Sequence, residues 1–233
     1  MSYLIGIDVG TTSTRALVIN DRGEALAAHA VEYPLSTPRP NWAEQDPELW
    51  WRATMSAVPA AIEQAGIGLS GQMHGAVFLD ADDEVIRPAL LWCDQRTARQ
   101  CDAITEAVGE EDLVRETLNP ALTGFTAPKI IWLRDEEPAN FQRLRKILLP
   151  KDFVRLRLTG EHATEVSDAS GTSLLNVPER RWSELIMDRL QLPMDLLPAV
   201  YESPEISGRI TAEAAAATGL TEGTPVVGGG GDQ

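Results

Sequence analysis

The sequence predicts an α/β domain built on a mixed β-sheet that begins with an antiparallel meander of three strands. Residues 3–8, 15–20 and 24–33 are successive strand-like runs, and Asp21-Arg22-Gly23 between the last two is typical of a tight turn. After this meander, helical patterns alternate with short apolar runs, as expected for helices on the faces of a sheet. No G-x-G-x-x-G follows the first strand, so the pattern does not indicate a dinucleotide-binding fold of the Rossmann type.

The remaining elements are predicted in chain order. Asp46-Pro47-Glu48 combines a helix N-cap, a first-turn proline and an early acid, and apolar residues follow at helical spacing, so we expect a helix over residues 47–64. Pro59 should kink or shorten it. We expect strands over 67–70 and 225–227, a hairpin of 76–80 with 85–91, and helices over 97–108, 128–134, 139–147, 151–158, 182–190 and 212–218.

Composition excludes several classes of protein. The formal net charge is −15, from 20 basic and 35 acidic residues, which argues against a nucleic-acid surface. It does not exclude a phosphate ligand, because a turn of backbone N–H groups can bind an anion locally. Cys93 and Cys101 are too few for a metal cluster and are interpreted as reduced thiols. No signal peptide or bilayer-length apolar run is evident, so we expect a cytoplasmic protein without a membrane partner.

The first motif with chemical meaning follows the first strand. Asp8 stands at the end of an apolar run, and the turn-like segment Gly10-Thr11-Thr12-Ser13 follows after Val9. Such a turn offers N–H groups and hydroxyls to a phosphate, and the neighbouring carboxylate can hold the magnesium that accompanies a nucleotide. The motif is therefore a candidate phosphate hairpin, and an ordinary hairpin with a polar turn is the alternative.

A second acid, Asp232, follows four consecutive glycines, which let the backbone approach a ligand closely. A carboxylate that hydrogen-bonds an alcohol can take its proton during phosphoryl transfer. The alternative is a flexible glycine tail with a solvated acid. Because the chain ends next to this apparent site, we expect the intact protein to continue beyond Gln233.

The loop Gln72-Met73-His74 lies between two glycines and offers hydrogen-bonding groups and an apolar wall that suit a polyhydroxyl ligand. Composition alone favours a structural role, since a single histidine or methionine more often belongs to the core. Lys151 and Asp152 are interpreted as a surface pair without a direct catalytic role. Residues 167–172 form a polar segment that could line a cleft.

Together these segments resemble the N-terminal domain of the FGGY family of carbohydrate kinases, and within it the branch that acts on D-xylulose. The resemblance covers essentially the whole chain in family order. Its segments are G-I-D-V-G-T-T-S, W-A-E-Q-D-P-E-L-W-W, G-L-S-G-Q-M-H-G, L-W-C-D-Q-R, G-F-T-A-P-K, L-L-P-K-D, S-D-A-S-G-T and G-G-G-D-Q. The Q-M-H-G loop indicates the xylulose branch.

The resemblance implies an actin-like, ribonuclease H-like fold with two domains and a cleft between them. Residues 1–233 would be the sugar-binding N-terminal domain, and the ATPase-like C-terminal domain would lie outside this chain. The implied reaction is ATP-dependent phosphorylation of D-xylulose at its 5-hydroxyl to D-xylulose 5-phosphate, with Mg²⁺.

The resemblance also implies roles for residues. Asp232 matches the catalytic base. Met73 and His74 match the sugar-contacting pair, in a loop where Gln72 contributes to specificity. Asp8 matches the acid near the phosphates and the metal, and the turn from Gly10 through Thr11, Thr12 and Ser13 matches the phosphate-facing turn.

Several expectations remain open at this level. Without a second domain the chain should be inactive or nearly so. The step from the helix to the strand near Ala65-Gly66 is shorter than expected, as if residues were missing there. The alternatives are a kinase for ribulose or another polyol, and a non-catalytic actin-like nucleotide-binding module. The expected partners are D-xylulose and ATP, with a homodimer as a candidate assembly.

Overall fold

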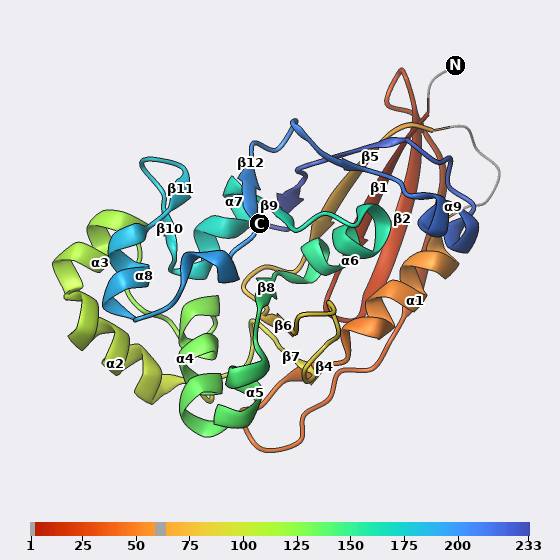
Figure 1. The fold of residues 1–233 in the computed structure, drawn as a ribbon. Coiled ribbons are helices and arrows are strands. Elements are labelled where there is room, and N and C mark those ends of the chain that lie inside the picture. The colour runs from red at the N-terminus through yellow and green to blue at the C-terminus, as the bar shows by residue number, and fades with distance from the viewer. Residues whose placement is uncertain (1–2, 59–63) are drawn as a thin grey trace.

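The computed structural model describes residues 3–58 and 64–233, and its first strands form the predicted meander. β1 (Tyr3–Val9), β2 (Ser13–Asn20) and β3 (Ala25–Glu32) pair antiparallel in sequence order (Figure 1). β5 (Gln64–Gly71) lies parallel to β1 on the opposite side from β2. The alternation of β1 decides which face is covered, because Ile5, Ile7 and Val9 are buried whereas Leu4 on the other face is exposed.

Among the described residues the main sheet has seven strands. β13 (Ile206–Arg209) and β14 (Pro225–Val227) extend it beyond β5 in the order β13-β14-β5-β1-β2-β3, and β15 (Gly230–Gly231) pairs parallel with the end of β5. β1, β5 and β15 all point the same way, with Gly71 beside both Val9 and Gly231. The segments that leave these three strands therefore meet at one edge of the sheet, as in other open α/β sheets that bind ligands at the carboxyl ends of their strands.

One core lies between the sheet and three helices. α1 (Pro47–Ala57), α6 (Pro150–Thr159) and α9 (Ala212–Thr218) pack over one face of the sheet, in front of it in Figure 1. The ring of Trp50 on α1 is fully buried, meets Phe153 of α6 edge-to-face at 6.5 Å, and donates its indole N–H to Gln45 at 2.9 Å. This packing fixes the sheet edge that carries the site.

A second core belongs to the helical part on the left of Figure 1. Its larger helices are α2 (Ala98–Val108), α3 (Glu110–Thr117), α4 (Thr126–Glu136), α5 (Pro138–Arg143) and α8 (Glu184–Arg189). Phe78, Ile130 and Leu133 are fully buried in it. The shorter elements are β4 (Glu44–Gln45), β6 (Val77–Leu79), β7 (Ala89–Leu90), β8 (Lys146–Leu148), β9 (Ala163–Glu165), α7 (Val166–Ala169), β10 (Leu175–Asn176), β11 (Arg181–Trp182), β12 (Ala199–Tyr201) and single 3₁₀ turns at Ser170–Thr172 and Met194–Leu196.

The first predicted helix is shorter than expected. It ends at Ala57 rather than at residue 64, and Val58 is extended, with ψ 124°. Proline disfavours the helical conformation of the residue before it, and Pro59 follows Val58. Gln64 to Gly66 belong to β5, not to the helix. The predicted kink at Pro59 and most of the connection expected to be longer lie outside the described residues.

The predicted hairpin of 76–80 with 85–91 is present, since Ala76 pairs antiparallel with Leu90 and Leu79 with Val85, and Asp80 donates its N–H to the carbonyl of Glu84 at 3.1 Å. Its two arms also pair with other strands, β6 with β8 and β7 with β4.

One further prediction is wrong in part. The helix over 139–147 ends at Arg143, because the chain then forms β8 against β6. Short apolar runs suit a helix or a strand equally well, and a partner distant in sequence decides between them.

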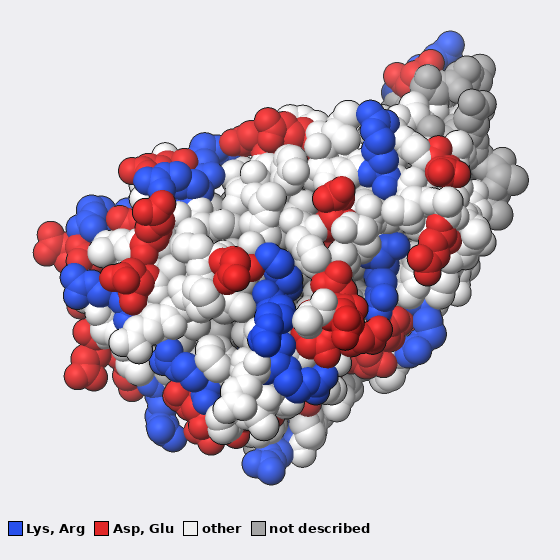
Figure 2. All heavy atoms as spheres, in the orientation of Figure 1, with Lys and Arg blue, Asp and Glu red and all other residues white. Residues whose placement is uncertain are grey.

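The described residues contain no helix long and apolar enough to cross a bilayer. On the face shown in Figure 2, Lys and Arg side chains are interspersed with Asp and Glu rather than gathered into a basic band. Both signs of charge are therefore present on this face, in a chain whose formal net charge is −15.

Candidate active site

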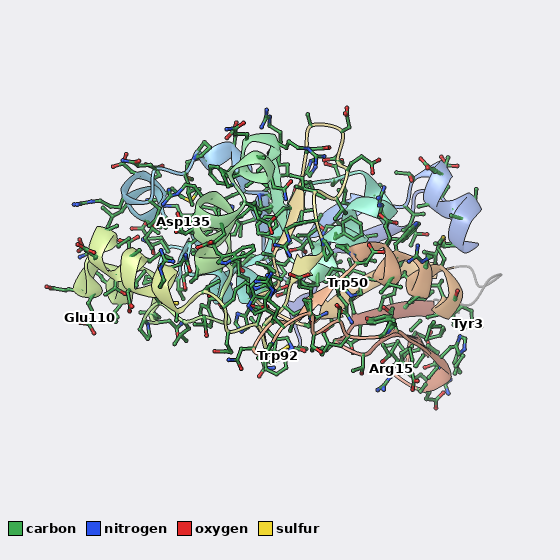
Figure 3. The ribbon with its side chains drawn as sticks, turned by 90° about the horizontal axis from the view of Figure 1, so that it is seen from below. Tyr3, Arg15, Trp50, Trp92, Glu110 and Asp135 are labelled. Atoms are coloured by element: carbon green, nitrogen blue, oxygen red, sulfur yellow. The ribbon has the colours of Figure 1, made fainter. Side chains whose placement is uncertain are left out.

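A pocket of about 270 Å³ opens where the strand ends meet. Its lining is Thr11, from the turn after β1; Met73 and His74, from the loop after β5; Trp92, after β7; and Asp232 with Gln233, after β15. Figure 3 places Trp92 between the sheet and the helical part, and the C-terminal end in Figure 1 lies in the same central region. The fold thus brings together residues that are more than 200 positions apart in the sequence.

The two predicted acids share this edge of the sheet. Asp8 lies on β1 between Arg15 of β2 and Ser70 of β5, and the backbone N–H of Asp232 donates to the carbonyl of Gly71 at 3.1 Å. Burial raises the pKa of Asp8 above its ordinary value, repulsion from Asp232 raises it further, and Arg15 partly opposes both. Asp8 Oδ1 is buried without a hydrogen-bond partner among the described residues. A buried acceptor left unpaired in this way is suited to a cation.

The candidate phosphate turn is held from several sides. The N–H of Gly10 donates to the carbonyl of Ser13 at 3.0 Å, and the Tyr33 hydroxyl donates to the carbonyl of Gly10 at 2.7 Å. Gln72 donates its amide N–H to the same carbonyl and accepts from the Thr11 hydroxyl, both at 3.2 Å. Gln72 is 1% exposed and lies outside the pocket lining, so its amide stabilises the turn through these hydrogen bonds.

Thr11 is the residue of the turn that lines the pocket. Trp92 donates its indole N–H to the Thr11 hydroxyl at 3.0 Å, which fixes that hydroxyl beside a half-exposed ring. No described residue accepts a hydrogen bond from the backbone N–H of Thr11 or Thr12. Successive free amides of this kind form a concave site for an anion.

His74 is held in a single orientation. Its backbone has φ +67°, which is uncommon for a side chain other than glycine, and its ring stacks on Phe125 at 4.4 Å between centroids. Nδ1 lies 2.7 Å from the carbonyl oxygen of Gly171. Because a carbonyl only accepts, Nδ1 carries the proton, and in the neutral ring Nε2 is an acceptor. Burial lowers the pKa of His74, which keeps the ring neutral at pH 7.

The glycine run before Asp232 is required by close packing. Gly229 has φ +79°, and a Cβ there would lie 2.0 Å from the carbonyl oxygen of Leu69. A Cβ on Gly231 would lie 2.6 Å from Cγ of Met73. The absence of side chains therefore lets the final segment run along β5 and brings Asp232 next to Met73.

The prediction that Lys151 and Asp152 form a surface pair is wrong. They lie at the centre of a fully buried charge cluster. Lys151 Nζ lies 2.9 Å from Asp152, 2.9 Å from Asp168 and 3.5 Å from Glu165, and all four side chains are inaccessible. Burial, together with the neighbouring acids, raises the pKa of Asp168 to about 7 despite Lys151. Apolar residues around the whole helix, such as Phe153, Val154 and Leu156, are the sequence signal that this helix is buried on all sides.

Arg155 links this cluster to the end of the chain. Its guanidinium is fully buried, contacts Asp152 at 3.3 Å, and donates to the carbonyls of Val227 at 2.7 Å and Gly228 at 2.6 Å. These carbonyls stand directly before the segment that carries Asp232. Arg155 lies more than 70 positions before the two carbonyls that it binds, so the sequence did not indicate the contact.

Comparison with known proteins agrees with this geometry. The model of the FGGY family of carbohydrate kinases, N-terminal domain, matches residues 3–233. The chain belongs to this family. A xylulose kinase of Escherichia coli strain K12 is 44% identical to it over 98% of the chain. As an FGGY domain it has the predicted actin-like fold: the solved xylulose kinase from Rhodospirillum rubrum superposes with a TM-score of 0.94 at 28% identity over 99% of the chain.

A solved kinase named for another substrate has the same fold. A solved gluconate kinase from Lactobacillus acidophilus superposes with a TM-score of 0.92 at 27% identity, again over 99% of the chain. The chain spans about half the length of the curated relatives it matches, 48% for the Escherichia coli protein, and 48–49% of these two solved chains. The match therefore concerns the N-terminal halves of longer kinases.

Proposed function

We propose that this chain is the sugar-binding N-terminal half of a kinase that transfers the γ-phosphoryl group of ATP to the 5-hydroxyl of D-xylulose. The observation that carries the proposal is the pocket in which Asp232, Met73 and His74 meet beside Asp8. The likeness to xylulose kinases at up to 44% identity supports this substrate. In such a kinase an ATPase-like second domain would follow Gln233 and complete the nucleotide site.

Each pocket residue has a role that its geometry suits. The exposed carboxylate of Asp232 accepts the proton of the attacking hydroxyl, and Nε2 of neutral His74 accepts a hydrogen bond from a second sugar hydroxyl. Met73 provides an apolar wall against the carbon chain. The free amides of Thr11 and Thr12 donate to a phosphate oxygen, with Ser13 and Gly10 closing the turn. Gln72 keeps this turn in place.

The residues present fit a magnesium ion bound together with a nucleotide. No group of three or more His, Cys, Asp or Glu side chains suited to a metal occurs in the described part of the chain. Mg²⁺ in phosphoryl-transfer enzymes usually needs only one or two carboxylates, because waters and phosphate oxygens complete its shell. Asp8, with its unpaired buried oxygen, is the residue that would hold it. The ion would supply neutralisation of the phosphate charge during transfer.

A sibling substrate is the second candidate, favoured by the superposition of a gluconate kinase with a TM-score of 0.92, against 0.94 for the xylulose kinase from Rhodospirillum rubrum. The test is ATP turnover by the intact protein with D-xylulose, D-ribulose, gluconate and glycerol, with the phosphorylated product identified by mass. We expect D-xylulose to give the highest kcat/KM. Preference for another polyol would transfer the proposal to that substrate. ATP hydrolysis indifferent to every sugar would instead support a non-catalytic actin-like module.

A further inference from the structure

Lys129, in the first turns of α4, is a fully buried lysine outside the pocket lining. Its ammonium is fully buried, and no carboxylate in residues 3–58 or 64–233 lies within ion-pairing distance of it. Its hydrogen-bond partners are two backbone carbonyls, those of His74 at 2.7 Å and of Gly124. Burial lowers the pKa of Lys129 to about 7, although the charge of the nearby Asp94 favours the ammonium form.

The nearby acid does not act as the partner of Lys129. Asp94 is itself buried and engaged by Arg96, whose guanidinium lies 2.7 Å from it. A buried cation without an ion-pair partner is costly to the folded state unless other groups compensate it. The compensation here comes from carbonyl dipoles, so the position of those carbonyls and the position of the ammonium depend on each other.

The two carbonyls belong to the two loops whose rings stack. His74 carries the imidazole of the pocket, and Gly124 directly precedes Phe125, on which that imidazole stacks with 13° between planes. The Thr126 hydroxyl donates to the same His74 carbonyl at 3.1 Å. Two donors from the start of α4 thus converge on the backbone of a residue that has a left-handed conformation.

We propose that Lys129 is a positioning residue for sugar recognition: its buried ammonium ties the His74 loop to the Gly124–Phe125 loop and thereby sets the direction of the His74 ring in the pocket. The inference rests on the proposed sugar-kinase function for its kinetic consequence only. Its structural consequence, the stacking of His74 on Phe125, is measurable in the ligand-free protein. Lys129 itself does not touch the substrate.

The test is Lys129→Met, which keeps the length and apolar volume of the side chain and removes its donors. We expect the KM for the sugar to rise on the order of tenfold or more, while the KM for ATP at saturating sugar changes less than threefold. The imidazole proton resonances of His74 should lose the ring-current shift that Phe125 imposes. The pKa of His74 should rise, because the repulsion from Lys129 that lowers it is removed.

Two further variants make the result decisive. Thr126→Val removes the other donor to the His74 carbonyl and leaves the buried charge in place, so it should shift sugar KM and the His74 resonances in the same direction by a smaller amount. It remains informative if Lys129→Met fails to fold. Lys146→Met is the matched control, since Lys146 also donates to a carbonyl, that of Asp195, but at the surface.

Folded Lys129→Met and Thr126→Val proteins with unchanged sugar KM and unchanged His74 resonances would overturn the proposal. So would an equal loss of sugar and ATP affinity, which would indicate general destabilisation. If the wild-type protein shows no sugar-dependent turnover, the proposed function fails, and the resonance and pKa of His74 still decide the positioning role.

Discussion

The replacement Gly171→Ala should weaken sugar recognition although it leaves every side chain that lines the pocket chemically unchanged. A Cβ at this position would lie 2.4 Å from Nδ1 and 2.5 Å from Cε1 of His74, and 3.2 Å from the terminal methyl of Met73. Ordinary van der Waals contact begins at 3.4 Å, so the imidazole must move by about 1 Å. The movement also stretches the 2.7 Å hydrogen bond from Nδ1 to the Gly171 carbonyl.

A displacement of about 1 Å at a substrate-positioning residue lowers catalytic efficiency roughly 100-fold. We therefore expect kcat/KM for D-xylulose to fall by about two orders of magnitude in the intact protein, mainly through KM. Overpacking should also cost about 1–3 kcal/mol, which lowers the melting temperature by several degrees. The assay is coupled ADP formation at varied D-xylulose and saturating ATP, with melting followed by fluorescence.

Gly6→Ala is the matched control, because a Cβ at Gly6 meets no atom within 4 Å and its backbone is that of an ordinary strand. It should leave the KM for D-xylulose and the melting temperature nearly unchanged. A folded Gly171→Ala protein with wild-type kcat/KM would refute the reasoning, since it would mean that the position of the His74 ring does not matter for the sugar.

Two other replacements separate stability from function. Asp8→Asn should abolish turnover yet raise the melting temperature of the ligand-free protein at pH 7, because the pKa of Asp8 is raised in the folded state and its ionised form therefore opposes folding. The gain should shrink as the pH falls through the raised pKa of Asp8 and vanish at the ordinary carboxyl pKa, so a gain that grows on acidification would contradict this. Arg155→Met should remove one of the two cations that contact the buried Asp152 and the donor to the carbonyls of Val227 and Gly228, at a cost of about 3–5 kcal/mol and on the order of 10 °C in melting temperature. Arg99→Met, at a side chain that is 82% exposed, should change the melting temperature little, and equal melting temperatures for the two variants would show that the buried contacts of Arg155 are not stabilising.

The parts of the fold that could be predicted from sequence are those specified locally. The meander follows from alternation and turn residues, and the helix over 212–218 and the strand over 225–227 have the predicted bounds. The helix over 139–147 was wrong at its end because β6, nearly 70 positions away, converts its last residues into a strand. Two- and three-residue strands such as β4 and β8 carry too little local pattern to be recognised.

The site divides in the same way. Short sequence motifs indicated four residues of the site, and the structure brings all four to one edge of the sheet: Asp8, Met73, His74 and Asp232. The residues that hold them could not be inferred, because their contacts span the chain: Lys129 reaches His74 across 55 positions, and Gly171 reaches it across 97. A lysine and a glycine of this kind look ordinary until the partner loop is placed beside them.

The central claim is that Asp232 takes the proton of a sugar hydroxyl at this pocket. The most direct measurement compares wild type and Asp232→Asn in the intact protein, with D-xylulose-dependent ADP formation for turnover and calorimetry for D-xylulose binding. The account predicts that kcat falls by at least about 100-fold, whereas the dissociation constant for D-xylulose changes by less than about tenfold. Turnover that survives the replacement, or ADP formation that never depends on a sugar, would contradict it.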